Sequence, residues 1–316
     1  MSTPSDNDYQ MMVDAISEGA LVLFLGAGAN LCARPKGAPW ERGQYLPDGS
    51  ELAAHLASEF RFTSSESRST CCHIPDLARV SQYAWLTSGS GPLCRELHHV
   101  LDFDYPLTPL HKFLANLPSI LRKKDYPPYQ LIVTTNYDDL LENAFKTAGE
   151  PFDLVTYETE EQYAGKFWHC PPEGKKQIIE KPNEYGNLSL EKRPVILKIH
   201  GTIDRVNKQQ DSFVITEDHY IDYLTQTNVL DMIPSKLLDK LRNNHLLFLG
   251  YSLRDWNLRV IFRLMWKTTR LHWKSWAIQL QPQELDTRFW AKRDVDIFDM
   301  PLKDFIDELD KRVRAL

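Results

Sequence analysis

The sequence predicts an α/β fold with a doubly wound, Rossmann-like parallel sheet. Four apolar runs of strand length are each followed at once by small or polar residues, as happens where parallel strands end at a nucleotide crevice. Segments with helical spacing lie between these runs. At 316 residues the chain is long enough for one large domain, and we expect residues 1–316 to form a single domain.

The first strand is expected over Leu21 to Leu25, an unbroken apolar run that follows an amphipathic helical pattern. Gly26, Ala27 and Gly28 come directly after it. Residues without bulk at a strand-to-helix turn let backbone N–H groups approach a pyrophosphate, and a helix that begins there adds its positive dipole end. Taken alone, these three residues are more typical of an ordinary tight turn.

Residues 51–125 are expected to form a helical insertion over the crevice. Four helix-like patterns fall in this region: Leu52 to Phe60, Ile74 to Trp85, Leu93 to Leu101 and Pro109 to Arg122. The region also holds Cys and His residues that could in principle bind zinc: Cys71, Cys72, His73, Cys94, His98 and His99. No pair of them has C-x-x-C spacing, so buried thiols and surface imidazoles without a metal are the favoured interpretation.

The second strand is expected over Gln130 to Thr135, and helical spacing follows from Asp138 to Ala148. Asn136 therefore falls at the carboxyl end of this strand, where its amide could hold a water or a ribose hydroxyl. Asp138 could accept a hydrogen bond from a carboxamide. The alternative interpretation makes Asn136 a turn residue and Asp138 a plain N-cap.

The third strand is expected over Val195 to Ile199, a buried pattern interrupted only by Lys198. It delivers His200 and Gly201 at its carboxyl end. Histidine exchanges protons near neutrality because its unperturbed pKa is about 6.5. A structural histidine is the alternative, although a neighbouring glycine permits the close approach of a ligand. Residues 158–193, just before this strand, are polar and interrupted by prolines, and we expect a loop or small flap.

The fourth strand is expected over Leu246 to Leu249, followed by the turn residues Gly250 and Ser252. Ser252 could bond a phosphate or ribose oxygen, and Arg254 could pair with a neighbouring acid, a phosphate or solvent. Two more strands and a closing amphipathic helix are expected to complete the sheet: Trp276 to Leu280, Val295 to Phe298, and Leu302 to Val313.

In order and spacing, these segments resemble the sirtuin superfamily, and more narrowly its bacterial branch found in anti-phage defence proteins. The glycine turn at Gly26, the Asn136-Tyr137-Asp138 stretch, His200-Gly201 and Gly250-Tyr251-Ser252 are similar to the family's motifs. Thr216 to Leu224 is similar to a helix that recurs in the bacterial branch. The resemblance covers nearly the whole chain and implies a site for NAD.

The resemblance also implies roles for individual residues. Asn136 and His200 would be catalytic, with His200 acting as general base or orienting the ribose hydroxyls. Asn30 stands where many sirtuins carry a serine after their glycine turn. The residues implied in NAD binding are Gly26, Ala27, Gly28, Asn30, Thr135, Asp138, Gly250 and Ser252.

Two departures from deacylating sirtuins favour water as the nucleophile. Residues 202–249, where those enzymes carry a zinc module with two cysteine pairs, contain no cysteine. The segment from Arg34 to Gly49 also replaces their usual loop after the glycine turn. We therefore expect a zinc-free NAD+ glycohydrolase that orients the ribose, holds the leaving carboxamide and positions a water at an oxocarbenium-like transition state. An NAD- or ADP-ribose-binding regulatory subunit without turnover and a zinc-free protein deacylase stay open as alternatives.

Composition suits a cytoplasmic enzyme. The formal net charge is −6, so no bulk attraction to nucleic acid is expected, and no apolar run is long enough to span a bilayer. The five cysteines are irregularly spaced, which is typical of a reducing compartment. The resemblance further implies an effector that depletes NAD in abortive infection, assembled as a homo-oligomer or with a separate sensor such as a HerA-type ATPase.

Overall fold

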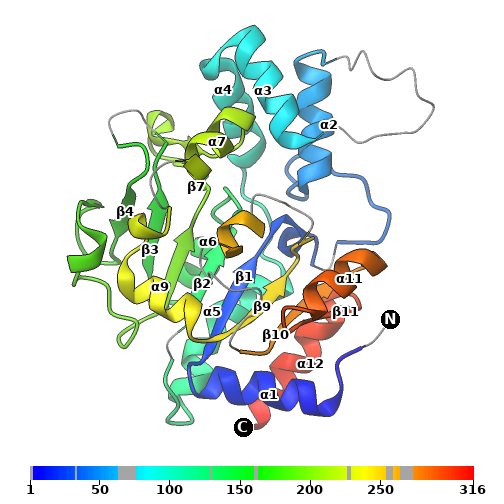
Figure 1. Cartoon of the computed structure of the whole chain (residues 1–316), viewed down its shortest axis with the longest axis vertical. Helices are drawn as coiled ribbons and strands as arrows, with labels where there is room; N and C mark the ends of the chain where they lie inside the picture. The colour runs from blue at the N-terminus through cyan, green and yellow to red at the C-terminus, as the bar shows by residue number, and fades with distance from the viewer. Residues whose placement is uncertain are drawn as a thin grey trace.

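The computed structural model of the chain describes residues 3–32, 34–62, 76–128, 130–159, 163–225, 229–253, 259–263 and 273–316. Within these residues, nine strands form one sheet in the order β11-β10-β9-β1-β2-β6-β3-β4-β5 (Figure 1). Its parallel strands are β1 (Leu21–Leu25), β2 (Leu131–Thr134), β3 (Asp153–Tyr157), β6 (Val195–Lys198), β9 (His245–Leu249), β10 (Ser275–Gln279) and β11 (Val295–Asp299).

The strand order reverses between β1 and β9. From β1 the chain moves to β2 on one side of the sheet, and it later returns to β9 on the other side. In the register of these pairs, Leu23 lies opposite Ile132 on β2 and Leu247 on β9. The prediction of a doubly wound parallel sheet is confirmed, and ligands of such sheets bind beyond the carboxyl ends of the strands at the reversal.

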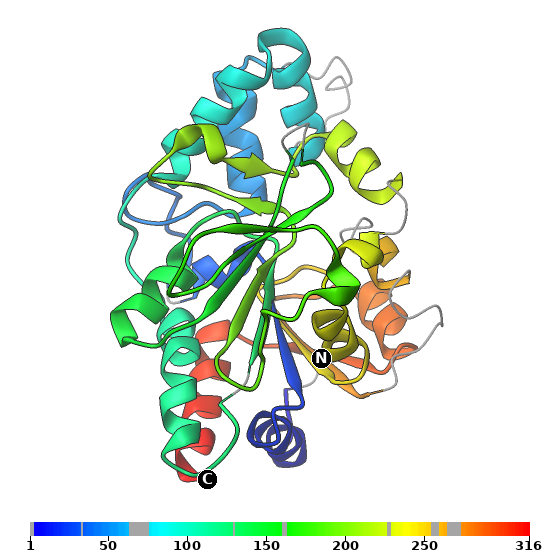
Figure 2. The same cartoon turned by 90° about the vertical axis from the view of Figure 1, so that its left-hand side faces the viewer.

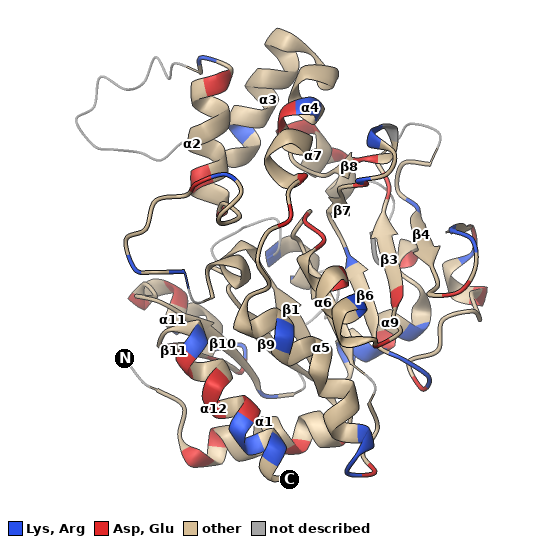
Figure 3. Cartoon of the chain, turned by 180° about the vertical axis from the view of Figure 1, so that it is seen from behind, with Lys and Arg blue, Asp and Glu red and all other residues tan. Residues whose placement is uncertain are grey.

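Helices cover both faces of the sheet (Figure 2). One layer consists of α1 (Asp6–Ser17), α5 (Pro109–Arg122), α6 (Leu140–Ala148) and α12 (Leu302–Ala315), and the other includes α8 (Val229–Met232), α9 (Ser235–Arg242) and α11 (Glu284–Ala291). Successive side chains of β1 point to opposite faces, so Leu23 packs in the first layer and Phe24 in the second. The helix α1 carries acidic residues, and α12 carries charged residues of either sign, coloured red and blue in Figure 3. Because the central strands are covered by a helical layer on each face, they are apolar at nearly every position.

A group of helices that we call the cap lies beyond the carboxyl ends of the strands (Figure 1). It comprises α2 (Gly49–Glu59), α3 (Leu77–Ser88), α4 (Ser90–Leu101), α7 (Glu217–Thr225) and the small hairpin of β7 (Gly201–Thr202) and β8 (Ser212–Phe213). Leu52, Val80 and Leu97 share one apolar cluster in it.

The fourth helical pattern of the expected insertion, α5, does not join the cap. Its apolar side chains, among them Leu114 and Leu117, pack in the first layer with α6 and α12 instead. The reason is that α5 carries a long apolar stripe that matches the sheet face.

Residues 158–193, expected as a loop or flap, contain two short strands. β4 (Phe167–Cys170) pairs antiparallel with β3, and β5 (Gln177–Ile179) pairs antiparallel with β4, so both extend the edge of the main sheet. β4 alternates between buried and half-buried positions, which is typical of an antiparallel strand with one face on the core. Short 3₁₀ turns, η2 (Pro182–Glu184) and η3 (Lys208–Gln210), follow along the chain. None of the helices described is long and apolar enough to cross a bilayer.

Candidate functional site

The glycine turn after β1 and the turn after β9 pack directly on one another. The Gly26 N–H donates to Leu249 O at 3.1 Å, and the Gly28 N–H donates to Gly250 O at 2.9 Å. A Cβ added to Gly28 would lie 2.7 Å from Gly250 O, and one added to Gly250, which has φ +65°, would lie 2.1 Å from the backbone N of Ala29. These glycines therefore serve the contact between the two turns, and their contact with a pyrophosphate stays a prediction.

A five-residue 3₁₀ helix, η1 (Ala27–Leu31), begins within the glycine turn. Asn30 is buried in it, at 7% exposed, and its Nδ2 donates to Asp138 Oδ2 at 2.9 Å. Asp138 Oδ1 accepts from the Leu140 N–H at 3.1 Å, but the N-cap of α6 is Asp139, so the interpretation of Asp138 as the N-cap is wrong. Asn30 Oδ1 is buried and has no hydrogen-bond partner among the described residues.

Asn136 lies where β2 meets the glycine turn. Its Nδ2 donates to Gly26 O at 3.1 Å, and its backbone N–H donates to Thr134 Oγ1 at 3.0 Å. The neighbouring Thr135 N–H donates to Leu25 O at 3.4 Å. An amide has two donor hydrogens and one acceptor oxygen. Within the described structure, the bond to Gly26 O uses one of these hydrogens and leaves Oδ1 and the second N–H for a ligand. Asn136 is therefore both a turn residue and a half-buried polar group at the strand end.

His200 follows β6 and is buried, at 3% exposed. Its Nε2 has no hydrogen-bond partner among the described residues. Burial lowers the pKa of His200 from 6.5 to about 3, because the charged imidazolium cannot be solvated there. The imidazole is therefore neutral at physiological pH, with a ring nitrogen that no described residue satisfies.

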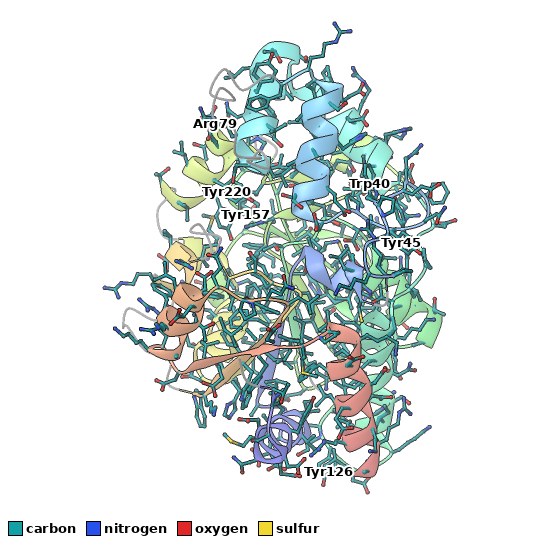
Figure 4. All side chains as sticks on the ribbon, turned by 90° about the vertical axis from the view of Figure 1, so that its right-hand side faces the viewer. Trp40, Tyr45, Arg79, Tyr126, Tyr157 and Tyr220 are labelled. Atoms are coloured by element: carbon teal, nitrogen blue, oxygen red, sulfur yellow. The ribbon has the colours of Figure 1, made fainter. Side chains whose placement is uncertain are left out.

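Aromatic side chains that the sequence did not single out enclose His200. Tyr220 and Tyr223 on α7 meet its ring edge-on, with ring centroids 5.4 and 5.8 Å away. Tyr157 packs on Tyr223 at 4.9 Å, and Figure 4 shows Tyr157 and Tyr220 between the cap and the sheet. The Tyr223 hydroxyl is also buried without a described partner, and burial raises its pKa. The resemblance pointed to this helix but gave it no role.

Gly201 allows the chain to fold back after His200. It has φ +86°, and a Cβ there would lie 2.1 Å from Ser212 O in the β7–β8 hairpin. The close approach that this glycine permits is therefore that of the Ser212 backbone. The Ile203 N–H then donates to Tyr137 O at 2.9 Å, which holds the segment after His200 against the loop that carries Asn136.

Lys198 is another residue near the site to which sequence reasoning gave no role. It is completely buried, and its Nζ donates to Asp138 O at 2.5 Å and to Glu142 Oε1 at 2.8 Å. The available signal was a single charged residue inside an apolar strand pattern.

The remaining sequence candidates are dispersed. Ser252 is exposed, and Arg254 lies outside the described residues, as do Cys71, Cys72 and His73. Cys94 is half-buried on α4, His98 bonds Asp211 and Asp102 at 2.7 and 3.1 Å, and His99 is exposed. Among the residues that the structure describes, no group of three or more Cys, His, Asp or Glu side chains could hold a metal ion.

Comparison with known proteins gives a family for the chain. The model of the SIR2-like domain family matches residues 130–298, from the start of the second segment into β11. Over 300 residues the chain is 22% identical to defense-associated sirtuin 2 of Bacillus subtilis, an alignment that covers 92% of this chain and 23% of that protein. The chain thus spans less than a quarter of the length of the curated relative it matches.

Proposed function

The chain belongs to the SIR2-like domain family, and we propose that it is an NAD+ glycohydrolase that cleaves NAD+ to nicotinamide and ADP-ribose. The observation that carries the proposal is the junction of the four segments at the carboxyl edge of the sheet. There the Asn136 amide lies on the glycine turn, while His200 Nε2 and Asn30 Oδ1 are buried without described partners.

The polar groups at this edge fit a ligand rich in hydroxyls. A buried polar atom left without a hydrogen bond costs about 1–3 kcal/mol, so a native structure that keeps two of them near one edge favours a ligand that satisfies them. Ribose hydroxyls can both donate and accept. The location at the strand-order reversal agrees with where dinucleotides bind doubly wound sheets.

The reaction requires the nicotinamide–ribose bond to break with its electron pair leaving on nicotinamide. Water then bonds to the anomeric carbon and releases one proton to solvent. Asn136 Oδ1 would accept from the attacking water and hold it in line, which is a contribution of orientation. His200, with a pKa lowered to about 3, is too weak a base to hold a proton near neutrality, so it would orient the ribose hydroxyls as a neutral imidazole.

The proposed biological role is anti-phage defence through depletion of NAD, ending in abortive infection. It is supported by the similarity to a relative named as a defense-associated sirtuin. We propose that the chain acts in the cytoplasm as a homo-oligomer, with a separate sensor such as a HerA-type ATPase supplying the trigger. Because the alignment covers only 23% of that relative, these assembly partners rest on the family resemblance alone.

The test is to incubate the purified protein with NAD+ and to quantify nicotinamide and ADP-ribose by chromatography, with His200→Ala as the control. A parallel tube contains an acetyl-lysine peptide. Release of both products without peptide, lost in His200→Ala, supports the hydrolase. O-acetyl-ADP-ribose formed only with the peptide would establish a deacylase instead, and calorimetric binding of NAD+ without products would favour a regulatory subunit.

A further inference from the structure

Lys198 ends β6, two residues before His200, and lies between two neighbouring strands. Its register partners are Thr134 on β2 and Thr156 on β3, and its side chain has no solvent exposure. A lysine ammonium is almost never fully buried unless its charge and its three N–H groups are satisfied. The proposed mechanism assigns no role to Lys198.

The contacts of the ammonium show what it holds. Nζ donates to Asp138 O at 2.5 Å, to Tyr137 O at 3.4 Å and to Glu142 Oε1 at 2.8 Å. The three hydrogens of the ammonium therefore have three acceptors, of which two are backbone carbonyls of the loop that follows β2. Only the third is the ion-pair partner on α6.

The same loop is joined to the segment that follows His200. Tyr137 O accepts from the Ile203 N–H at 2.9 Å and from Thr202 Oγ1 at 3.4 Å, in addition to Lys198. One buried charge thus lies where the Asn136 loop and the His200 segment meet. The short bond of the ammonium to the loop is the one to Asp138 O at 2.5 Å, and charge-assisted hydrogen bonds are about twice as strong as neutral ones.

We infer that Lys198 is a positioning residue: its ammonium holds the Asn136–Asp138 loop against the segment that carries His200, and so sets the relative placement of the two side chains that act on NAD+. The inference rests on the proposed hydrolysis for its kinetic consequence. It extends that proposal by assigning the buried charge to the loop carbonyls, with the Glu142 pair in a supporting role.

The competing explanation is that Lys198 only neutralises Glu142. Burial raises the pKa of the Glu142 carboxyl, and the Lys198 ammonium opposes that effect. The two explanations separate in a set of three variants. Glu142→Gln removes the ion pair but keeps a lysine that can donate to both carbonyls. Lys198→Met removes the donors, and Lys198→Met/Glu142→Gln removes them without leaving an unpaired buried carboxylate, which protects the fold.

If Lys198 positions the loop, Glu142→Gln keeps a kcat close to wild type, whereas Lys198→Met and the double variant lose kcat by about 100-fold, as expected for a misplacement near 1 Å. KM changes little, because the nucleotide contacts proposed for the turns after β1 and β9 remain. A double variant that is folded and regains the wild-type kcat would show that Lys198 serves only as the counter-ion of Glu142, and the inference would be wrong.

Hydrogen–deuterium exchange supplies a readout that does not require turnover. Peptides covering residues 130–142 and 199–205 should exchange faster in the double variant than in Glu142→Gln, including at the Ile203 N–H that bonds Tyr137 O. Equal protection in the two variants overturns the inference even if both are inactive. If the wild-type protein releases no nicotinamide, the proposed function fails, and the exchange comparison still decides the role of Lys198.

Discussion

Replacing His200 by asparagine is expected to make the stability of the protein less sensitive to acid. Burial lowers the pKa of His200 from 6.5 to about 3, so the folded protein excludes the imidazolium while the unfolded chain accepts it below pH 6.5. The stabilising preference for the neutral ring is thus fully present above pH 6.5 and is lost as the pH falls from 6.5 toward 3. Asparagine has no titrating group, so the variant lacks this contribution.

The magnitude follows from the difference between the two pKa values. At 1.36 kcal/mol for each pKa unit, the interval from 6.5 to about 3 corresponds to roughly 5 kcal/mol at the acid limit. At pH 5, His200 is substantially protonated only in the unfolded chain. The free energy of unfolding is therefore about 2 kcal/mol lower at pH 5 than at pH 8. His111 is also buried, and burial lowers its pKa to about 4, but it is present in both proteins and cancels in the comparison.

The measurement is the free energy of unfolding from urea titrations followed by tryptophan fluorescence at pH 8 and pH 5. Between these pH values, His200→Asn should lose about 2 kcal/mol less stability than the wild type. His99→Asn, at an exposed position on α4, is the matched control and should follow the wild type. Identical pH dependence in wild type and His200→Asn would refute the assignment of a buried neutral imidazole.

Three further predictions concern the site. Asn136→Ala should lower kcat for NAD+ cleavage by at least 10²-fold, as expected when an orienting group is lost, with only the small fall in melting temperature that the lost bond to Gly26 O brings; a lower melting temperature with normal kcat would leave Asn136 as a turn residue only. Gly149→Ala and Gly250→Ala form a matched pair, with φ +69° and +65°. The first has open space and should cost about 1–2 kcal/mol, whereas the second meets the backbone of Ala29 and should cost more in thermal unfolding, so equal costs would contradict the turn packing. Exhaustive chelation should leave NAD+ cleavage unchanged. Activity that is lost on chelation and restored by added zinc would contradict this and would point to a zinc site among the residues from Cys71 to His99.

Much of the fold was predictable because its signals are local. β1 coincides with the apolar run predicted for it, β6 and β9 differ from their predicted bounds by one residue at one end, and β2 is one residue shorter than predicted at each end. A strand buried on both faces needs an unbroken apolar sequence, and the polar residue that ends it falls at the sheet edge. β4 was missed because its alternation covers only four residues within a polar segment.

In the site, too, local features were predictable from the sequence and long-range contacts were not. The sequence could place Asn136 and His200 at strand ends, since each directly follows an apolar run. It could not assign their partners. The amide of Asn136 bonds Gly26 O, which is 110 positions away in the chain, and the Lys198 ammonium bonds Asp138 O, which is 60 positions away. Such contacts depend on which strands become neighbours.

By itself, the sequence determined the parallel sheet, the strand ends and the polar residues at those ends, because hydrophobic periodicity and chain punctuation are properties of neighbouring residues. Only the tertiary structure decided that the turns after β1 and β9 pack on one another, that α5 joins the sheet layer, and that His200 is neutral. Each of these depends on burial by segments distant in sequence. Burial sets both the space left for a Cβ and the solvation of a charge, and neither is encoded in a local pattern.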